Sequence, residues 1–347
     1  MITFATSEGL SEARRQKLAP QHIYNQPENM TKETLLTAVI ISLITATGPV
    51  SHTTAQDFTI SGEYAKQSKR HPGITPYVPD VSEVEARLGV AYETTESGRT
   101  LKMDIYSPTK KGGDLTPIVL IHGGGWQSGR RNLDAPLAAR LAEGGLCAFC
   151  VDYRLSVEAK YPAAIVDINS ALTWIGEHSE DLGVDISRLT VAGTSAGGQM
   201  AALVGASNGR VEKYIPKNKV VPRIECVVDI DGVLAFIHPD SSEGQDKPGK
   251  PSCATKWLGT PMSADSALWR EASALSHIGE WSADRFIFIN SSQKRFSAGQ
   301  AEAVEALRKA GKKATEHKTE GTPHTFWLFE PWAEDVAELI IKEIEEN

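Results

Sequence analysis

Short apolar runs alternate with amphipathic segments along most of the chain beyond residue 117. The continuous runs, bounded by polar or glycine-containing turns, predict strands that are covered on both faces. Between them, apolar residues such as Ile165, Ile168 and Ile175 recur at helical spacing. The predicted strands are 117–121, 146–152, 188–192, 224–231, 285–290 and 314–320, and the predicted helices are 136–143, 162–182, the segment after Ser195, 298–310 and 331–346.

Strands that alternate with helices are typical of right-handed β-α-β units. The sequence therefore predicts an α/β fold with a mostly parallel central sheet and helices on both faces. Upstream, residues 88–94 and 100–106 flank the turn Glu96–Arg99. In the second of these segments apolar residues alternate with polar ones, which predicts a half-buried strand.

Two segments do not follow this alternation. Residues 56–87 are polar and contain proline, which predicts an extended N-terminal arm packed on the domain. Residues 232–284 separate two predicted strands, and their stretch Gly244–Pro251 is rich in glycine, proline and charge. We therefore expect a lid-like insertion at 232–284 over the carboxyl edge of the sheet, within a main domain at 88–347.

The N-terminal segment has the pattern of a processing signal. Residues 35–46 are mostly apolar and uncharged, and they follow Met30-Thr31-Lys32. This run is too short for a membrane span, which needs about 20 residues, but it suits a signal peptide. We expect a signal peptide at 30–55 behind a mis-called or disordered leader at 1–29, and hence a secreted or periplasmic protein without an integral membrane anchor. A buried helix of the fold is the alternative.

Composition narrows the class of protein. Hydrophobic residues make up 41% and charged residues 23%, as in ordinary globular proteins, and the net charge of −8 disfavours a nucleic-acid partner. The four cysteines lack metal-ligand spacing. Cys147 and Cys150 are expected in the core. A disulfide between Cys226 and Cys253 is possible, because exported proteins can form disulfides.

A candidate nucleophile lies between a predicted strand and a predicted helix. Gly193 and Gly197 flank Ser195 at the G-x-S-x-G spacing. This spacing marks a sharp strand-to-helix turn that exposes a serine and directs the positive end of the helix toward the reacting atoms. A glycine-rich turn with a passive serine is the alternative reading.

Two further loops are expected at the same edge of the sheet. The segment His122–Trp126 contains three successive glycines directly after a strand, so the amides of Gly124 and Gly125, with that of Ala196, are predicted to form an oxyanion hole. His324 lies between the last strand and the last helix and follows Ser195 in chain order. It is therefore the predicted general base.

These motifs resemble those of α/β-hydrolases, close to the esterase and lipase group that includes hormone-sensitive-lipase-like and feruloyl-esterase-like enzymes. The resemblance covers residues 88–346 and implies the α/β-hydrolase fold. A narrower similarity is to carbohydrate esterases associated with pectin methyl-ester hydrolysis. It rests on 229–236, on 289–292 with Arg295 and Phe296, and on 323–327 with Pro331 and Trp332. The residues that carry the wider resemblance are 122–126, 152–155, 162–164 with Asp167, 193–198 and His324.

The sequence departs from this resemblance at the acid of the triad. Enzymes of this group usually carry an aspartate shortly after the strand 285–290, but residues 291–295 contain no carboxylate. Asp231, at the end of the preceding strand, is our first candidate. Glu302 is the second, Asp229 lies deeper in the same strand, and a water or a backbone carbonyl is the remaining alternative.

Arg295 occupies the loop that usually holds the acid. It is a candidate for binding a substrate carboxylate, as in a uronic acid polymer, and an internal salt bridge is the alternative. Trp126 is expected as a wall of the pocket. We predict a secreted serine esterase that acts on esterified polysaccharide without metal or cofactor. A general carboxylesterase or lipase, and a non-catalytic binding protein of this fold, are the alternatives.

Overall fold

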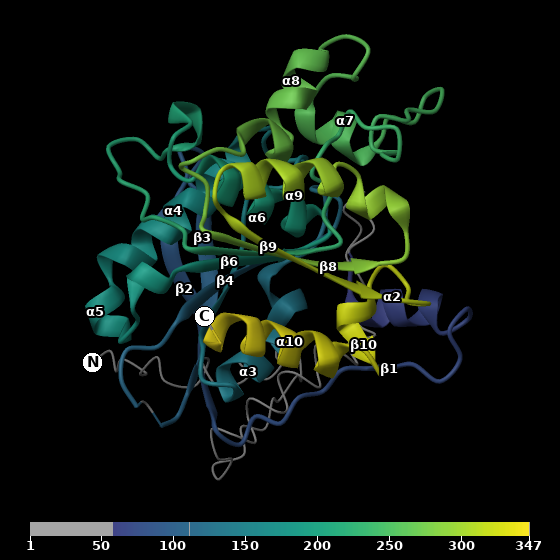
Figure 1. Ribbon diagram of the computed structural model, residues 1–347. Coiled ribbons are helices and arrows are strands. Elements are labelled where there is room, and N and C mark those ends of the chain that lie inside the picture. The colour runs from purple at the N-terminus through teal and green to yellow at the C-terminus, as the bar shows by residue number, and fades with distance from the viewer. Residues whose placement is uncertain (1–57, 111, 347) are drawn as a thin grey trace, which may run out of the picture. The chain divides into compact units, whose positions relative to one another are not determined.

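A computed structural model describes residues 58–110 and 112–346. An eight-stranded sheet has the strand order β2-β3-β5-β4-β6-β7-β8-β9 (Figure 1). β2 pairs antiparallel with β3, and β3 with β5, whereas all other neighbours are parallel, so the predicted mostly parallel sheet is confirmed. The strands are β2 (Val84–Thr94), β3 (Thr100–Pro108), β4 (Pro117–Ile121), β5 (Cys147–Val151), β6 (Thr190–Thr194), β7 (Cys226–Ile230), β8 (Arg285–Ser291) and β9 (Lys313–Thr319).

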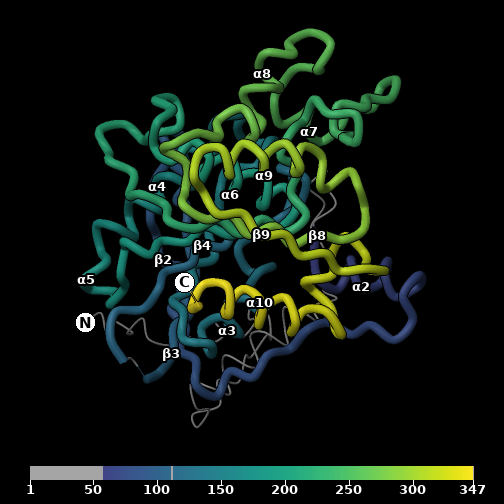
Figure 2. Tube along the Cα trace, viewed as in Figure 1, coloured from purple at the N-terminus to yellow at the C-terminus, as the bar shows by residue number. Residues whose placement is uncertain are grey.

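Helices cover both faces of the sheet, as predicted (Figure 1). On one face lie α3 (Ala135–Glu143) and α10 (Ala333–Glu345), and on the other lie α4 (Ala163–Glu177), α6 (Ala196–Ser207) and α9 (Gln300–Lys309). The trace in Figure 2 shows the C-terminal α10 beside α3, which comes much earlier in the chain. Each layer thus encloses its own apolar core against the sheet.

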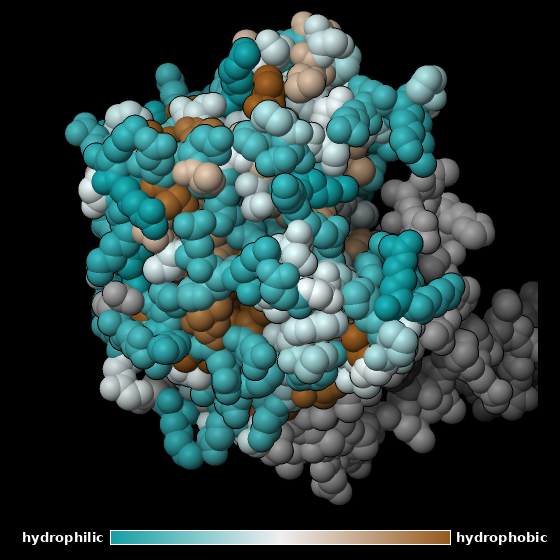
Figure 3. All heavy atoms as spheres, turned by 45° about the vertical axis from the view of Figure 1, so that its right-hand side comes forward, coloured by the Kyte–Doolittle hydropathy of each residue, from teal (hydrophilic) through white to brown (hydrophobic). Residues whose placement is uncertain are grey.

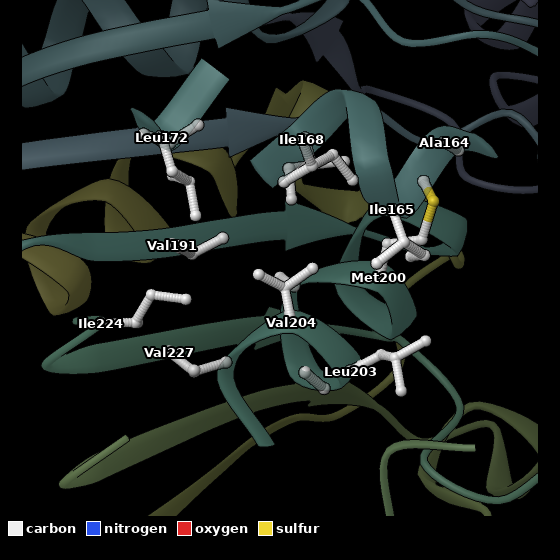
Figure 4. Close-up of a cluster of buried hydrophobic side chains, with 14 of the residues drawn as sticks. Ala164, Ile165, Ile168, Leu172, Val191, Met200, Leu203, Val204, Ile224 and Val227 are labelled. Carbon is white, nitrogen blue, oxygen red and sulfur yellow. The ribbon is translucent and has the colours of Figure 1, made fainter. Parts of the chain in front are cut away.

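The core between α4, α6 and the sheet fixes the elements that precede and follow Ser195. Ile168 and Leu172 of α4 and Val204 of α6 lie close to Val191 of β6 and Val227 of β7, and all five are buried (Figure 4). Burial of each such side chain stabilises the fold by about 1.5–3 kcal/mol. By contrast, the face shown in Figure 3 is largely hydrophilic, with hydrophobic residues in small separate spots.

The remaining elements are short. β1 pairs antiparallel with β10 in a separate two-stranded sheet, which joins the N-terminal arm to the C-terminal part of the chain. The segment 232–284, expected as an insertion, lies between β7 and β8 and contains α7 and α8, which lie at the top of Figure 1. The bounds are α2 (Ile60–Gln67), β1 (Thr75–Pro76), α5 (Ser179–Leu182), α7 (Cys253–Leu258), α8 (Ser266–Glu271) and β10 (Phe329–Glu330), with short 3₁₀ helices that include η1 (Arg131–Asp134), η4 (Ala274–His277) and η5 (Lys294–Ser297).

Two predicted segments differ in the structure. The arm 56–87 is not simply extended, because Thr59 caps α2 by accepting a hydrogen bond from the Gly62 amide. The helix predicted at 162–182 is divided into α4 and α5 at His178. There the backbone leaves the helical conformation, with φ at −116°.

None of the four cysteines forms a disulfide within the described residues. Cys226 is buried within β7, whereas Cys253 begins α7 and is partly exposed, so the disulfide considered between them is not formed.

The leader and signal peptide expected at 1–29 and 30–55 lie outside the described residues. In the part of the chain that is described, no helix combines the length and the apolar character needed to cross a bilayer.

Asp134, at the junction of η1 and α3, is buried without a partner for its Oδ2 among the described residues. Burial raises the pKa of Asp134 to about 7, whereas in the unfolded chain it is near 3.8. The folded state therefore favours the protonated form, and its stability decreases as the pH rises from about 4 through 7. We expect Asp134→Asn to stabilise the protein by about 2–4 kcal/mol at pH 8 and far less at pH 4. Thermal unfolding at both pH values measures this, and an equal gain at both would contradict it.

Candidate active site

Two loops meet where the strand order of the sheet reverses. β5 lies on one side of β4 and β6 on the other, so the carboxyl ends of β4 and β6 flank this point. Ligands of open α/β sheets bind at such points. The glycine loop His122–Trp126 follows β4, and Ser195 follows β6.

Ser195 occupies the sharp turn between β6 and α6. Its φ of 55° and ψ of −117° lie outside the conformations common for a residue with a side chain. Both flanking glycines are required by close backbone contacts. A Cβ on Gly193 would overlap the carbonyl oxygen of Gly197, and a Cβ on Gly197 would overlap that of Ile121. The G-x-S-x-G spacing is therefore a steric requirement of this turn.

Ser195, His324 and Asp231 form a continuous series of hydrogen bonds. Ser195 Oγ lies 2.7 Å from His324 Nε2, and His324 Nδ1 lies 2.9 Å from Asp231 Oδ2. Because a carboxylate oxygen only accepts, Nδ1 carries a proton, and Nε2 of the neutral ring accepts from the Ser195 hydroxyl. Asp231 is fully buried, whereas the His324 side chain is 22% exposed. This arrangement has the geometry of a general base beside a hydroxyl nucleophile.

The carboxylate of Asp231 is fixed from two sides. Asp231 directly follows β7, and its Oδ1 accepts a 2.7 Å hydrogen bond from the Ser291 amide at the end of β8. Its own amide donates to the carbonyl oxygen of Ile289 at 3.0 Å. The neighbouring strand therefore holds Asp231 so that Oδ2 faces His324.

The other two carboxylates considered from the sequence lie elsewhere. Glu302 Oε1 is 3.2 Å from His238 Nε2, and the Glu302 side chain is 53% exposed. Asp229 is buried, its Oδ1 accepts from the Gly232 amide at 2.8 Å, and burial raises the pKa of Asp229 well above its ordinary value. Among the described residues, Asp231 alone has a carboxylate hydrogen-bonded to His324.

Phe296, predicted only as part of the narrower resemblance and without a role at the site, lies against His324. The two rings are nearly parallel, with centroids 3.5 Å apart and an interplanar angle of 5°. Trp327 meets the same imidazole edge-on at 5.3 Å. The electron-rich face of a phenyl ring stabilises a cationic imidazolium and fixes its orientation. The available signal was the position of Phe296 in the loop after the strand 285–290.

The glycine loop packs directly against the turn that carries Ser195. A Cβ on Gly123 would lie 3.3 Å from the Cβ of Ser195. Gly124 and Gly125 have φ values of 121° and 60°, which favour glycine. No acceptor among the described residues satisfies the amides of Gly124, Gly125 or Ala196. Free amides beside a nucleophile are suited to an oxyanion.

Gln199, which sequence reasoning missed, connects three parts of the site. It is fully buried in α6, and its Oε1 accepts a 3.0 Å hydrogen bond from Trp126 Nε1. Its Nε2 donates to the carbonyl oxygen of Ala272 in the insertion at 2.9 Å. Trp126 has a φ of 59° and stacks on Trp257, with centroids 5.3 Å apart. Gln199 thus holds the glycine loop, the helix after Ser195 and the insertion together.

A cavity of about 470 Å³ contains Ser195 and His324. Trp126 lines it, together with Glu243 and Cys253 from the segment 232–284. Part of the wall comes from the N-terminal arm, in and just after α2, which the sequence did not suggest. The lining residues of the arm are Lys66, Gln67, Arg70 and His71.

Arg295 lines the same cavity, and its guanidinium is paired within the protein. Its Nη2 donates to Glu243 Oε1 at 2.7 Å, and the guanidinium lies 4.4 Å from the centroid of the Phe296 ring. The Arg295 side chain is 46% exposed. The internal salt bridge considered from the sequence is therefore formed, and only the other N–H groups of the Arg295 guanidinium remain for a ligand.

The chain is similar to known proteins in sequence. Residues 103–306 match the model of the BD-FAE family. Over 166 residues, which are 48% of this chain and 50% of that protein, the chain is 34% identical to Carboxylesterase NlhH of Mycobacterium tuberculosis. It is 27% identical to an AB hydrolase superfamily protein of Schizosaccharomyces pombe, over 73% of this chain and 75% of that protein. The chain thus spans about half the length of the carboxylesterase that it matches.

Solved structures show the same fold. A truncated carbohydrate esterase from gut microbiota has a TM-score of 0.62 at 18% identity, covering 79% of this chain and 100% of that one. Esterase 2 of Thermogutta terrifontis in its apo form has a TM-score of 0.58 at 25% identity, covering 77% and 93%. These likenesses confirm the predicted α/β-hydrolase fold. Because the matching family model covers more than half of the sequence, the chain belongs to the BD-FAE family.

Proposed function

We propose that the protein is a serine carboxylic ester hydrolase. The observation that carries this proposal is the hydrogen-bonded series Ser195, His324 and Asp231, which reaches a cavity beside free backbone amides. Relatives named as a carboxylesterase and as esterases support the same activity.

The proposed reaction proceeds through an acyl-enzyme. Ser195 Oγ attacks the ester carbonyl carbon while His324 Nε2 takes the hydroxyl proton. The amides of Gly124, Gly125 and Ala196 bind the oxyanion of the tetrahedral intermediate. His324 then gives its proton to the leaving alcohol, the ester C–O bond breaks, and the acyl group remains on Ser195. Water then attacks the acyl carbon while His324 takes its proton. The bond to Ser195 Oγ breaks, Oγ regains the proton from His324, and the acid leaves.

Asp231 orients His324 in this scheme. Its carboxylate accepts the Nδ1 proton, which keeps Nε2 directed at Ser195 and stabilises the imidazolium as it forms. Phe296, stacked on the same ring, supports that orientation. No metal or organic cofactor takes part in this mechanism.

We further propose that the ester is carried by a polysaccharide outside the cytoplasm, as a pectin-type methyl ester or an acyl ester. A carbohydrate esterase among the structures of the same fold supports this choice. So does a cavity with many polar lining groups, where Trp126 offers part of a wall. Secretion rests on the apolar stretch at 35–46 and stays a prediction.

Product analysis distinguishes the candidate esters. Purified protein is incubated with methylated pectin, acetylated pectin, acetylated xylan and p-nitrophenyl butyrate, and methanol, acetate and nitrophenol are measured. We expect methanol or acetate from at least one polysaccharide, with a higher kcat/KM than for the nitrophenyl ester. Hydrolysis of the nitrophenyl ester alone would favour the general carboxylesterase. The sequence identity to Carboxylesterase NlhH supports that alternative.

A further inference from the structure

The place of His324 fixes where the alcohol part of an ester must lie. The nitrogen that takes the proton of Ser195 also protonates the leaving oxygen, so that oxygen has to reach Nε2. The alcohol part therefore extends into the region of the cavity beside His324. The acyl group extends away from it, toward Cys253, which lines the cavity beside Gly125 of the glycine loop.

The N-terminal arm lies beside His324. Thr325, the residue after His324, donates through Oγ1 to Glu63 Oε1 of α2 at 3.3 Å. Figure 1 shows α2 and α7 on opposite sides of the end of β8. Because residues from both segments line one cavity, the arm forms the wall on the alcohol side.

The arm makes this wall cationic. Lys66 and Arg70 are exposed, and Lys66 keeps 64% of its side-chain surface although Glu63 lies 3.2 Å away. The Arg70 guanidinium has no partner among the described residues. The two acids that line the cavity are buried and hydrogen-bonded, Asp231 to the neutral His324 and Glu243 to Arg295, so neither presents an exposed carboxylate to Lys66 and Arg70.

We propose that Lys66 and Arg70 bind an anionic alcohol part, and that the substrate is an acyl ester on an acidic sugar chain. This inference rests on the proposed function and selects among its substrates. A carboxylate on the leaving sugar, near the ester, meets the two cations as the sugar hydroxyl departs. A methyl ester releases its alcohol part as uncharged methanol, which makes no contact with Lys66 or Arg70. The wall thus favours deacylation of a uronate polymer over its demethylation.

The test measures acetate released from two acetylated chains that differ in charge. Acetylated polygalacturonate is acidic, whereas acetylated xylan is neutral. We expect the wild type to prefer the acidic chain. The double variant K66Q/R70Q should lower the ratio of the two kcat/KM values about tenfold, mainly through KM, because two exposed charge contacts are lost. Raising the salt concentration to 0.5 M should lower the wild-type ratio as well.

Lys69→Gln is the matched control. It removes one positive charge, half of what K66Q/R70Q removes, from an exposed residue next to Arg70 that does not line the cavity, so the ratio should stay as in the wild type. Arg295→Gln tests the other cation of the cavity. If Arg295→Gln lowers the ratio and K66Q/R70Q does not, the site on the arm is refuted.

Two outcomes separate this proposal from the esterase itself. Ser195-dependent hydrolysis of p-nitrophenyl acetate with no preference for the acidic chain would overturn the anionic site and leave the esterase in place. Faster release of methanol from methylated pectin than of acetate from acetylated polygalacturonate would also overturn it. Absence of hydrolysis of every ester would refute the proposed function.

Discussion

Replacing Ser195 with alanine should lower kcat for p-nitrophenyl acetate by about 10⁴–10⁶-fold. Without Oγ no acyl-enzyme forms, and the remaining amides stabilise only a slow direct attack by water. The methyl side chain of alanine fits the same turn, so the melting temperature should change little. Initial rates and thermal unfolding, measured on the same preparation, separate a loss of chemistry from a loss of fold.

Ser292→Ala is the control for this substitution. Ser292 is an exposed serine of the loop after β8, and no step of the proposed mechanism uses it. It should hydrolyse the ester as the wild type does. Equal activity of Ser195→Ala and the wild type would contradict the esterase and favour a non-catalytic binding protein.

Replacing Asp231 with asparagine should lower kcat by about 10⁴-fold, the size of effect seen when a triad aspartate becomes an amide. The carboxylate accepts the Nδ1 proton of His324, whereas an amide nitrogen in its place would donate. The imidazole would then carry its proton on Nε2, where it cannot accept from Ser195. KM should change much less than kcat, since Asp231 acts on His324 and is fully buried.

Glu302→Gln is the control for the assignment of the acid. Glu302 is about half exposed and hydrogen-bonds to His238, so its loss should leave kcat within about twofold of the wild type. The reverse result, with Glu302→Gln impaired and Asp231→Asn active, would overturn the choice of Asp231. Circular dichroism of both variants checks that any loss of activity is not caused by a loss of the folded structure.

Much of the fold could be predicted because local pattern determines it. The strand 117–121 has the same bounds in the structure, and the alternation of strands and helices predicted the parallel sheet. Ser195 and its flanking glycines could be identified because the turn between β6 and α6 leaves no room for a Cβ on either glycine. Chain order and position at a strand end then suggested His324 and Asp231, whose catalytic roles await the experiments above.

The features that escaped prediction depend on contacts between distant segments. α2 lies more than a hundred residues before Ser195, and its place beside His324 depends on the Glu63–Thr325 contact and on the pairing of β1 with β10. Phe296 and Gln199 look like ordinary core residues in the sequence. Their function follows only from ring geometry and hydrogen bonds.

The hydrogen bond that His324 donates to Asp231, directly after β7, has a consequence for sequence variation. Since Asp231 supplies the carboxylate partner of His324, the loop after β8 need not carry one. Ser292 and Gln293 are exposed there and belong to neither strand nor helix. Gln293 also lines the cavity, so mutations at this position can reshape the mouth of the cavity without touching the Ser195–His324–Asp231 series. This loop is thus a natural place to randomise when new ester preferences are selected.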